Sequence, residues 1–469
     1  MKKWLSRSLI LVLLLITVLI PTVFVSALHA VVMEDVSANM ADISVGRTFQ
    51  RDTFWGAGRA WVFYMGYDPL NASHIYYRSS ADGVNWATRT LFCDVTNADQ
   101  FSLYWDGVYV HTVWVCNDAM QPGVSYRRGT PNSNGTITWV ATQEVQIPSI
   151  VDGYMLPTIT AYGGRPYLAY GYMVGPTSLW SAESSNVTTG AWSPDVVFEN
   201  LDITAGNFTA TACIDAFPAS GIINVTVENV IAPAVTQEVG AYMYWAGAWA
   251  PYETIDSAGT PSELFSTIAW GDYLNVIFVR SAPAWHTYHR QSAIGGIWAV
   301  APPPIEICDG SYQIASLSLW DDANGDLKCF FADNGGANNI AWKMYDNALA
   351  TWDVGYFELV TVNACDRLQS SVSHASPLGV VYEDFLMPDI DSVYYDWLDS
   401  FPPTPIAPIN YVAAFGSWLF ILIAVIVLAT VAIILSALSG GNMIENTMHI
   451  LVVGVIIALA ILLIMTIVD

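Results

Sequence analysis

Basic residues are scarce in this chain. Of its 469 residues, 16 are Lys or Arg and 41 are Asp or Glu, which gives a formal net charge of −25 at pH 7. A surface this acidic repels a phosphate backbone, so we expect no nucleic-acid partner. Several enzyme signatures are also missing from the sequence, including the HExxH zinc motif, the GxSxG elbow, the phosphate loop and the dinucleotide fingerprint.

The first 30 residues have the pattern of an export signal. Basic residues precede a long apolar run, and small-residue cleavage sites follow it. An uncleaved signal anchor is the alternative. Either interpretation predicts that the domain at 31–400 lies outside the cell.

The other end of the chain carries two long runs without charge, at 411–438 and 450–468. Each is long enough to span a bilayer, and neither has the polar face that a helix packed on a soluble core would show. A short loop at 439–449 joins them, and a proline-rich spacer at 401–410 precedes them. We therefore expect an integral protein of the cell membrane, and the two helices could also support a homo-oligomer.

Evenly spaced tryptophans mark a repeat between these ends. A Trp opens a short β-rich run at six positions, separated by 53, 53, 57, 49 and 54 residues. The six are Trp86, Trp139, Trp192, Trp249, Trp298 and Trp352. Each period contains four strand-like runs, as at 48–54, 60–67, 73–80 and 85–92 in the first unit. Four-stranded units repeated at this spacing predict an all-β β-propeller, whereas a two-sheet sandwich would not require the repeat.

The ends of the repeat region bear on the number of blades. Six complete units fill 47–363, and three further strands remain before residue 400. We expect the segment at 36–45 to supply the missing strand, which would close the ring by joining both ends in one blade. Seven blades are favoured, and six are the alternative.

The stretch RSSADGVNW, at 78–86, lies in the connection between the third and fourth strands of the first unit. Ser and Asp side chains accept hydrogen bonds from turn backbone, and Gly readily adopts a left-handed conformation. We therefore interpret Ser80, Asp82, Gly83 and Trp86 as a structural turn whose Trp packs between blades. The pattern resembles a shortened Asp-box, the turn motif of sialidase-like (BNR) β-propellers, which usually have one more residue between Asp and Gly.

This resemblance implies a search for a sialidase site. Such a site needs three arginines around the substrate carboxylate, a Tyr activated by Glu, and an acidic Asp. Arg47, Arg51 and Asp52 lie near the innermost strand of the first unit, where an early family arginine is expected. Glu383 and Asp384 lie near the closing strands and could form a carboxylate pair. No Arg-Ile-Pro motif is present, so the catalytic residues stay unassigned, with these five as candidates.

The sequence DDANGD, in the first hairpin of the sixth unit, is a candidate metal loop. Asp322, Asn324 and Asp326 alternate and would place three oxygen ligands on one side of a tight loop, as calcium requires. Asn-Gly is also a favoured hairpin turn without any metal. We expect no obligatory cofactor, with calcium as the candidate ion.

Six cysteines in an exported region favour disulfides over metal-thiolate sites, since no CxxC pair occurs. Cys93 and Cys116 occupy the same places in the repeat as Cys308 and Cys329. In each pair, the segment that enters a blade passes the end of that blade's second strand. We therefore predict the disulfides Cys93–Cys116 and Cys308–Cys329. The pairing of Cys213 and Cys365 stays open.

Five sequons lie between the export signal and the membrane runs. An exported domain can carry N-linked glycans at exposed sequons, so all five are candidate sites. They are Asn71, Asn134, Asn186, Asn207 and Asn224.

Three functions are compatible with these features. The first is a membrane-anchored extracellular recognition module that binds a glycan or a protein on one face of the propeller. The second is a tethered glycoside hydrolase of sialidase-like type, and the third is a structural component of a cell envelope or appendage. Abundant aromatic residues, 13% of the chain, suit a sugar-binding surface but also suit packing between blades.

Overall fold

The computed structural model describes most of the chain between residues 30 and 398. The described ranges are 30–33, 50–67, 73–93, 98–116, 123–140, 145–148, 157–173, 177–186, 191–192, 196–201, 208–217, 220–231, 236–245, 248–257, 265–280, 286–294, 296–308, 312–321, 326–333, 339–355, 357–361, 365–370, 378–387 and 390–398. They belong to the first of two compact units, 1–402 and 403–469. No helix within these ranges is long and apolar enough to cross a membrane. The predicted spans lie outside them.

The described strands form seven antiparallel sheets, here called sheets 1–7 in chain order. Sheet 1 contains β2 (Thr53–Gly56), β3 (Arg59–Tyr67), β4 (Ser73–Ser80) and β5 (Thr90–Leu91). Sheet 2 contains β6 (Ala98–Trp105), β7 (Val110–Cys116), β8 (Gly123–Pro131), β9 (Ile137–Trp139) and β10 (Val145–Pro148). Sheet 3 contains β11 (Thr158–Tyr162), β12 (Arg165–Met173), β13 (Thr177–Asn186), β14 (Ala191–Trp192) and β15 (Val196–Leu201).

The remaining sheets repeat this arrangement. Sheet 4 contains β16 (Phe208–Ala216), β17 (Ile223–Ile231), β18 (Thr236–Trp245), β19 (Ala248–Trp249) and β20 (Glu253–Asp256). Sheet 5 contains β21 (Phe265–Trp270), β22 (Tyr273–Arg280), β23 (His286–Ala293) and β24 (Ile305–Cys308), with the 3-10 helix η2 (Trp298–Val300) before β24. Sheet 6 contains β25 (Tyr312–Asp321), β26 (Asp326–Asp333), β27 (Asn339–Asp346), β28 (Thr351–Trp352) and β29 (Phe357–Thr361).

Sheet 7 joins the two ends of the propeller. It contains β30 (Cys365–Ser370), β31 (Leu378–Met387) and β32 (Ile390–Leu398), and its fourth strand is β1 (Ala30–Met33). The closing strand is therefore not the predicted segment at 36–45, which lies outside the described residues. The apolar stretch AVVM pairs with β32 instead, and it begins at the last residue of the predicted export signal.

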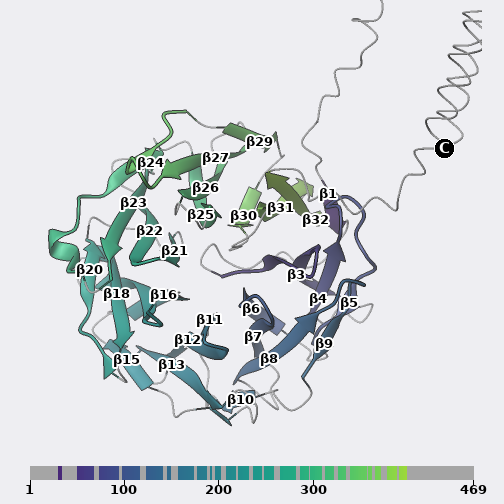
Figure 1. Ribbon diagram of the computed structural model, residues 1–469, viewed down its shortest axis with the longest axis horizontal. Coiled ribbons are helices and arrows are strands. Elements are labelled where there is room, and N and C mark those ends of the chain that lie inside the picture. Colours follow the sequence, from purple (N-terminus) through teal and green to yellow (C-terminus); the bar gives the residue numbers. More distant parts are fainter. Residues whose placement is uncertain are drawn as a thin grey trace, which may run out of the picture. The chain divides into compact units, whose positions relative to one another are not determined.

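The sheets are arranged around a common centre, with the first strand of each sheet innermost (Figure 1). Consecutive inner strands contact one another from β2 through β6, β11, β16, β21 and β25 to β30, and β31 contacts β2. This closed ring of sheets confirms the predicted all-β β-propeller. The innermost strand of each sheet is an edge strand, and the ring leaves these edges short and protected by the neighbouring sheets.

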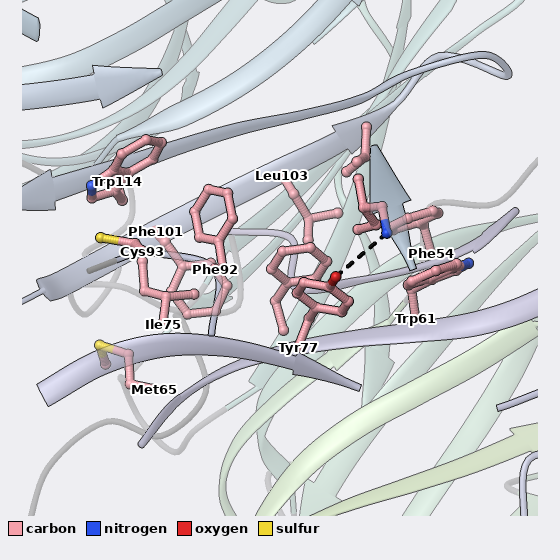
Figure 2. Packing of buried hydrophobic residues seen from close by; sticks show 13 residues of the cluster. Phe54, Trp61, Met65, Ile75, Tyr77, Phe92, Cys93, Phe101, Leu103 and Trp114 are labelled. Atoms are coloured by element: carbon pink, nitrogen blue, oxygen red, sulfur yellow. Dashed lines mark hydrogen bonds between the residues drawn. The ribbon is translucent and has the colours of Figure 1, made fainter. Parts of the chain in front are cut away.

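Packing between neighbouring sheets explains the tryptophan period. Trp139 of sheet 2 lies against Phe63, Tyr77 and Phe92 of sheet 1, with ring centroids 4.7 Å from Phe92. Figure 2 shows the cluster around these rings, in which the Ile137 amide donates to the Tyr77 hydroxyl at 3.4 Å. This periodic Trp therefore packs between its own sheet and the preceding sheet.

The same contact recurs farther around the ring. Trp298 of sheet 5 is buried in a cluster to which sheets 4 and 5 both contribute. Trp352 of sheet 6 donates its Nε1 hydrogen to His289 Nδ1 of sheet 5 at 3.1 Å. Full burial of a large apolar side chain contributes about 1.5–3 kcal/mol, which applies to Trp298, whereas Trp139 and Trp352 are partly buried and contribute less.

Candidate functional site

The turn at 80–86 is held by its own side chains. Ser80 Oγ accepts the Gly83 amide hydrogen at 2.9 Å, and Asp82 Oδ1 accepts the amide hydrogens of Val84 and Asn85 at 2.9 and 2.8 Å. Gly83 has a φ of 74°, the left-handed conformation that the turn needs. Burial raises the pKa of Asp82, but the hydrogen bonds from Asn85, Val84 and Ser80 outweigh it and lower the pKa to about 2. These contacts organise a turn and leave no reactive group in a cleft.

Arg51, a candidate catalytic residue, lies at the centre of the ring. Its amide hydrogen bonds to Ser102 Oγ of β6 at 3.2 Å, and its carbonyl accepts the Leu103 amide at 2.8 Å. The guanidinium lies 5.3 Å above the Tyr104 ring and 3.1 Å from Asp215 Oδ2 on β16 of sheet 4. Arg51 therefore links sheets 1, 2 and 4 across the inner strands.

Asp215 holds this ion pair in place. Its Oδ1 accepts the Ala216 amide at 2.9 Å and the Thr160 hydroxyl at 3.3 Å, and its Oδ2 accepts the Ala269 amide at 2.8 Å. Arg51 and Asp215 are both buried. Burial lowers the pKa of Arg51, yet the attraction of Asp215 outweighs it and the net pKa is raised.

Of the neighbours of this pair, Cys213 is buried and Tyr104 is partly exposed. Burial, reinforced by Asp215, raises the pKa of Tyr104 to about 12. Burial also raises the pKa of the Cys213 thiol to about 12. Arg51 is already paired with a carboxylate and is sealed from substrate, so the geometry assigns it a structural role.

Of the other four catalytic candidates, only Asp52 has a described side chain. Asp52 is fully buried, and its carbonyl accepts the Phe63 amide at 2.9 Å. Arg47 and the side chains of Glu383 and Asp384 lie outside the described residues; the last two are consecutive in β31. A convergence of three arginines is not seen among the described residues.

A second buried polar chain runs through sheet 2. His111 on β7 contacts Asp106 Oδ2 through Nε2 at 3.0 Å and the Tyr126 hydroxyl through Nδ1 at 2.8 Å. His111 and Tyr126 are buried, and burial raises the pKa of Tyr126. Asp106 also accepts the Val108 and Tyr109 amides in the turn between β6 and β7. The triad resembles catalytic chemistry in its residue types, but it fastens a turn to the sheet.

A partly exposed polar group on sheet 5 offers a more accessible surface. We call Asp256, Arg280, His286, Tyr288 and Glu306 the Tyr288 cluster. Glu306 Oε1 lies 2.9 Å from His286 Nδ1, and Glu306 Oε2 accepts from the Tyr288 hydroxyl at 3.4 Å. Glu306 is exposed, and the imidazole, phenol and guanidinium are partly exposed.

Arg280 connects the cluster to sheet 4. Its Nε and Nη2 hydrogens bond to the two carboxylate oxygens of Asp256 at 3.0 and 2.5 Å, which raises the pKa of Arg280. Its Cζ lies 4.2 Å from the Tyr288 ring centroid, and Phe278 stacks on that ring at 6.0 Å. The bidentate Arg280–Asp256 pair holds the guanidinium against the Tyr288 ring, which also contacts Phe278. The cluster therefore presents several hydrogen-bonding groups in a rigid arrangement.

The candidate calcium loop is only partly described. Asp326 Oδ1 accepts the Asn347 amide at 3.0 Å, while Asp322 and Asn324 lie outside the described residues. Within the described ranges, no group of three or more His, Cys, Asp or Glu side chains is placed to hold a metal ion. Calcium at this loop stays a prediction.

The cysteine predictions need a correction. Cys308 and Cys329 lie in one buried cluster between sheets 5 and 6, but Cys329 is a free thiol, so the predicted disulfide between them is absent from this structure. Burial, followed by the proximity of Cys308, raises the pKa of Cys329 well above its usual range. The repeat correctly predicted that the two residues lie in one cluster, but Cys329 is buried there as a thiol. The side chains of Cys116 and Cys365 lie outside the described residues.

One sequon is inaccessible. Asn224 is the second residue of β17 and is fully buried beside Thr226, so a glycan cannot be attached in the folded protein. Asn134, by contrast, is exposed in the turn after β8, where its Oδ1 accepts the Thr136 amide and hydroxyl hydrogens at 3.1 and 2.8 Å. Asn71, Asn207 and the side chain of Asn186 lie outside the described residues.

Sequence reasoning missed both Asp215 and the Tyr288 cluster. Asp215 stands alone in the apolar strand FTATACIDAF, a signal that predicts a buried and therefore paired charge. Tyr288 and Glu306 are 18 residues apart, and only the pairing of β23 with β24 brings them together. No local motif marks that contact.

Comparisons with known proteins agree on architecture. No family model matches the sequence, and no curated protein matches it. The polysaccharide lyase Uly1 is 9% identical, with a TM-score of 0.50 over 75% of this chain and 90% of its own. An ulvan lyase of polysaccharide lyase family PL25 is 10% identical, with a TM-score of 0.51 over 78% of this chain and 96% of its own.

The NanB sialidase from Streptococcus pneumoniae is a more distant neighbour. It is 10% identical, with a TM-score of 0.40 over 77% of this chain and 71% of its own. At these identities the likeness to the two lyases shows the fold alone, a β-propeller. The Asp-box resemblance stays a prediction.

Proposed function

We propose that the chain is a membrane-anchored, extracellular, seven-bladed β-propeller that recognises a glycan, and that the Tyr288 cluster contributes to the binding site. The observation that carries this proposal is the cluster itself. A guanidinium, an imidazole, a phenol and a carboxylate meet at one partly exposed edge, with the phenol fixed by the Arg280–Asp256 pair. Sugar hydroxyls both donate and accept hydrogen bonds, and such a set can satisfy several of them at once.

The structural neighbours support the choice of ligand class. Two of them are described as polysaccharide lyases, and one ulvan lyase was solved with a bound glucuronic acid–rhamnose sulfate chain. The common fold does not transfer their substrates, but it makes a glycan the first ligand class to test.

The test is a glycan array probed with the full chain in detergent, followed by calorimetry on the glycans that bind. We expect Glu306→Gln to weaken binding by roughly 10- to 100-fold, because a hydrogen bond to a charged group contributes about 1.5–3 kcal/mol. Asp272→Asn is the matched control, since it removes one exposed carboxylate at the opposite end of the same sheet. If the Glu306 variant and the wild type bind with equal affinity, the Tyr288 cluster is not part of the binding site.

A tethered glycoside hydrolase is the second candidate, favoured by the Tyr288–Glu306 contact. The bound glycans would be incubated with the full chain and analysed for new reducing ends. Turnover that is lost in Tyr288→Phe, while binding persists, would establish the hydrolase. Binding without turnover would leave recognition as the function.

A further inference from the structure

The connection between β23 and β24 of sheet 5 ends in three consecutive prolines. It passes through η2 and continues as residues 301–304 (APPP) before β24 begins at Ile305. A proline ring fixes its own φ at about −65°, and a residue that precedes a proline is held in the β or polyproline II region. This sequence therefore favours the polyproline II conformation over 301–304, here called the proline ridge.

The backbone and the exposure of the ridge agree with that conformation. Ala301 has a φ of −63° and a ψ of 155°, close to the polyproline II values of about −75° and about 145°. A polyproline II helix has about three residues per turn, so residues three apart share one edge. Ala301 and Pro304 are half-buried, while Pro302 and Pro303 between them are exposed. One edge of the ridge is therefore partly covered, and the other two face solvent.

Arg290 of β23 holds the ridge in place. Its Nε hydrogen bonds to the Pro302 carbonyl at 3.0 Å, and its Nη2 hydrogens bond to the carbonyls of Trp298 and Ala301 at 2.5 and 3.3 Å. Its Nη1 also donates to the Ile255 carbonyl of sheet 4. The Trp298 ring is buried, with its centroid 5.6 Å from the Arg290 Cζ atom. The ridge is thus anchored through its backbone carbonyls, and its exposed pyrrolidine rings stay available for other contacts.

Apolar side chains on both sides of the ridge are exposed as well. Val300 is 81% exposed, Ile297 56% and Ile305 41%. The ridge leads into β24, the outermost strand of sheet 5, so these groups lie at the outer rim of the ring (Figure 1). Single exposed apolar residues are ordinary, whereas several together on one fixed segment are typical of an interaction surface.

We propose that the proline ridge is a docking site for a protein partner that carries an aromatic-lined groove. Polyproline II segments bind such grooves, in which aromatic faces pack against the proline rings. A segment that is already rigid loses little conformational entropy on binding, and Arg290 supplies this rigidity. Glu306, exposed just beyond the ridge, favours a groove with a basic residue at its rim.

The chemistry of the ridge distinguishes this partner from a glycan. Proline has no backbone N–H, and neither its ring nor the side chains of Val300 and Ile305 can form a hydrogen bond. Sugar hydroxyls need such partners, which the Tyr288 cluster offers. Docking at the ridge therefore requires neither glycan binding nor membrane anchoring.

The test measures binding of the full chain, in detergent, to immobilised WW and SH3 domains, which stand in for the aromatic-lined groove. We expect saturable binding to at least one of them and competition by a soluble proline decamer. Pro302→Ala with Pro303→Ala should weaken binding at least about tenfold, because two apolar rings are lost from the interface. Pro251→Ala removes an exposed proline before β20 in sheet 4, so it is the matched control and should bind as the wild type does.

Urea unfolding followed by tryptophan fluorescence would check that the variants fold. If the double variant does not fold, the single variant Pro303→Ala carries the test, with an expected loss in affinity of at least about threefold. The ridge would be refuted as a docking site by binding to none of the domains, by binding that persists in excess decamer, or by equal binding of the double variant. Self-association of the chain that the double variant abolishes would show a second copy as the occupant and would also overturn the proposal.

Discussion

Replacing Asp215 by alanine tests the buried centre of the ring most directly. The change removes the carboxylate that pairs with Arg51 at 3.1 Å and accepts hydrogen bonds from Ala216, Ala269 and Thr160. Arg51 stays buried with its charge uncompensated, because the Nη2 contact with Asp215 is lost and neither Nη1 nor Nη2 has a hydrogen-bond partner among the described residues. The substitution therefore lowers stability mainly because it leaves the Arg51 charge buried without a partner.

The expected magnitude follows from that charge. Removing one partner of a buried ion pair typically costs about 3–5 kcal/mol, whereas the volume lost from Asp to Ala is small. Asp215→Ala should lower the free energy of unfolding by that amount. Asp272→Ala, at an exposed position, should change it by less than about 0.5 kcal/mol.

A paired substitution distinguishes the stranded charge from lost hydrogen bonds. In Arg51→Met with Asp215→Leu, both charges disappear and apolar side chains fill the space, so most of the loss should be recovered. The coupling energy of the double-mutant cycle should exceed about 1 kcal/mol, since the residues are in direct contact.

The assay is urea unfolding of the full chain in detergent at pH 7, followed by tryptophan fluorescence. The pair would be shown to be solvated by either of two results. One is a loss in the free energy of unfolding below about 1 kcal/mol for Asp215→Ala. The other is a double variant whose loss equals the sum of the losses of the Arg51 and Asp215 single variants. The structural role assigned to Arg51 would then fail.

Three further predictions concern acid, thiols and glycans. The folded pKa of Asp82 is lowered to about 2, so its stabilising contribution is complete above the unfolded pKa near 4 and is lost as the pH falls toward 2. In Asp82→Asn, the free energy of unfolding measured against pH should lack this part of the acid-induced decrease. The same pH profile in the variant and the wild type would contradict the stabilising role of the turn's hydrogen bonds. Cys213 and Cys329 should resist iodoacetamide in the native protein and react after denaturation, as mass spectrometry would show; rapid native labelling would contradict their burial. Expression through a eukaryotic secretory pathway should leave Asn224 unmodified and modify Asn134, and peptide mapping that found a glycan on Asn224 would refute the assignment of β17 to the core.

The repeat made the architecture predictable. Large rings at a regular spacing must pack against something, and Trp139 and Trp352 both do so against the preceding sheet. The third strand of the first unit was predicted at 73–80 and observed as Ser73–Ser80, because its run of β-favouring residues is a local signal. Its fourth strand, predicted at 85–92, is only Thr90–Leu91, since the hydrogen-bonded turn at 80–86 uses the earlier residues.

The site was much less predictable than the fold. Arg51 was selected for its place near an innermost strand, but its partner Asp215 is 164 residues away and is reached only after the ring closes. The contact of Tyr288 with Glu306 likewise depends on the pairing of two strands separated by an irregular connection. Distance along the chain carries no information about such contacts.

The sequence by itself determined the repeated unit, its turn chemistry and the acidic character of the domain, because periodicity, local hydrogen bonding and charge are properties of neighbouring residues. The tertiary structure decided which charges are sealed at the centre, which cysteine remains a thiol, which sequon is buried and which strand closes the ring. Each of these depends on groups from different sheets meeting in a low-dielectric interior, where burial and partnership set the energy of a polar group.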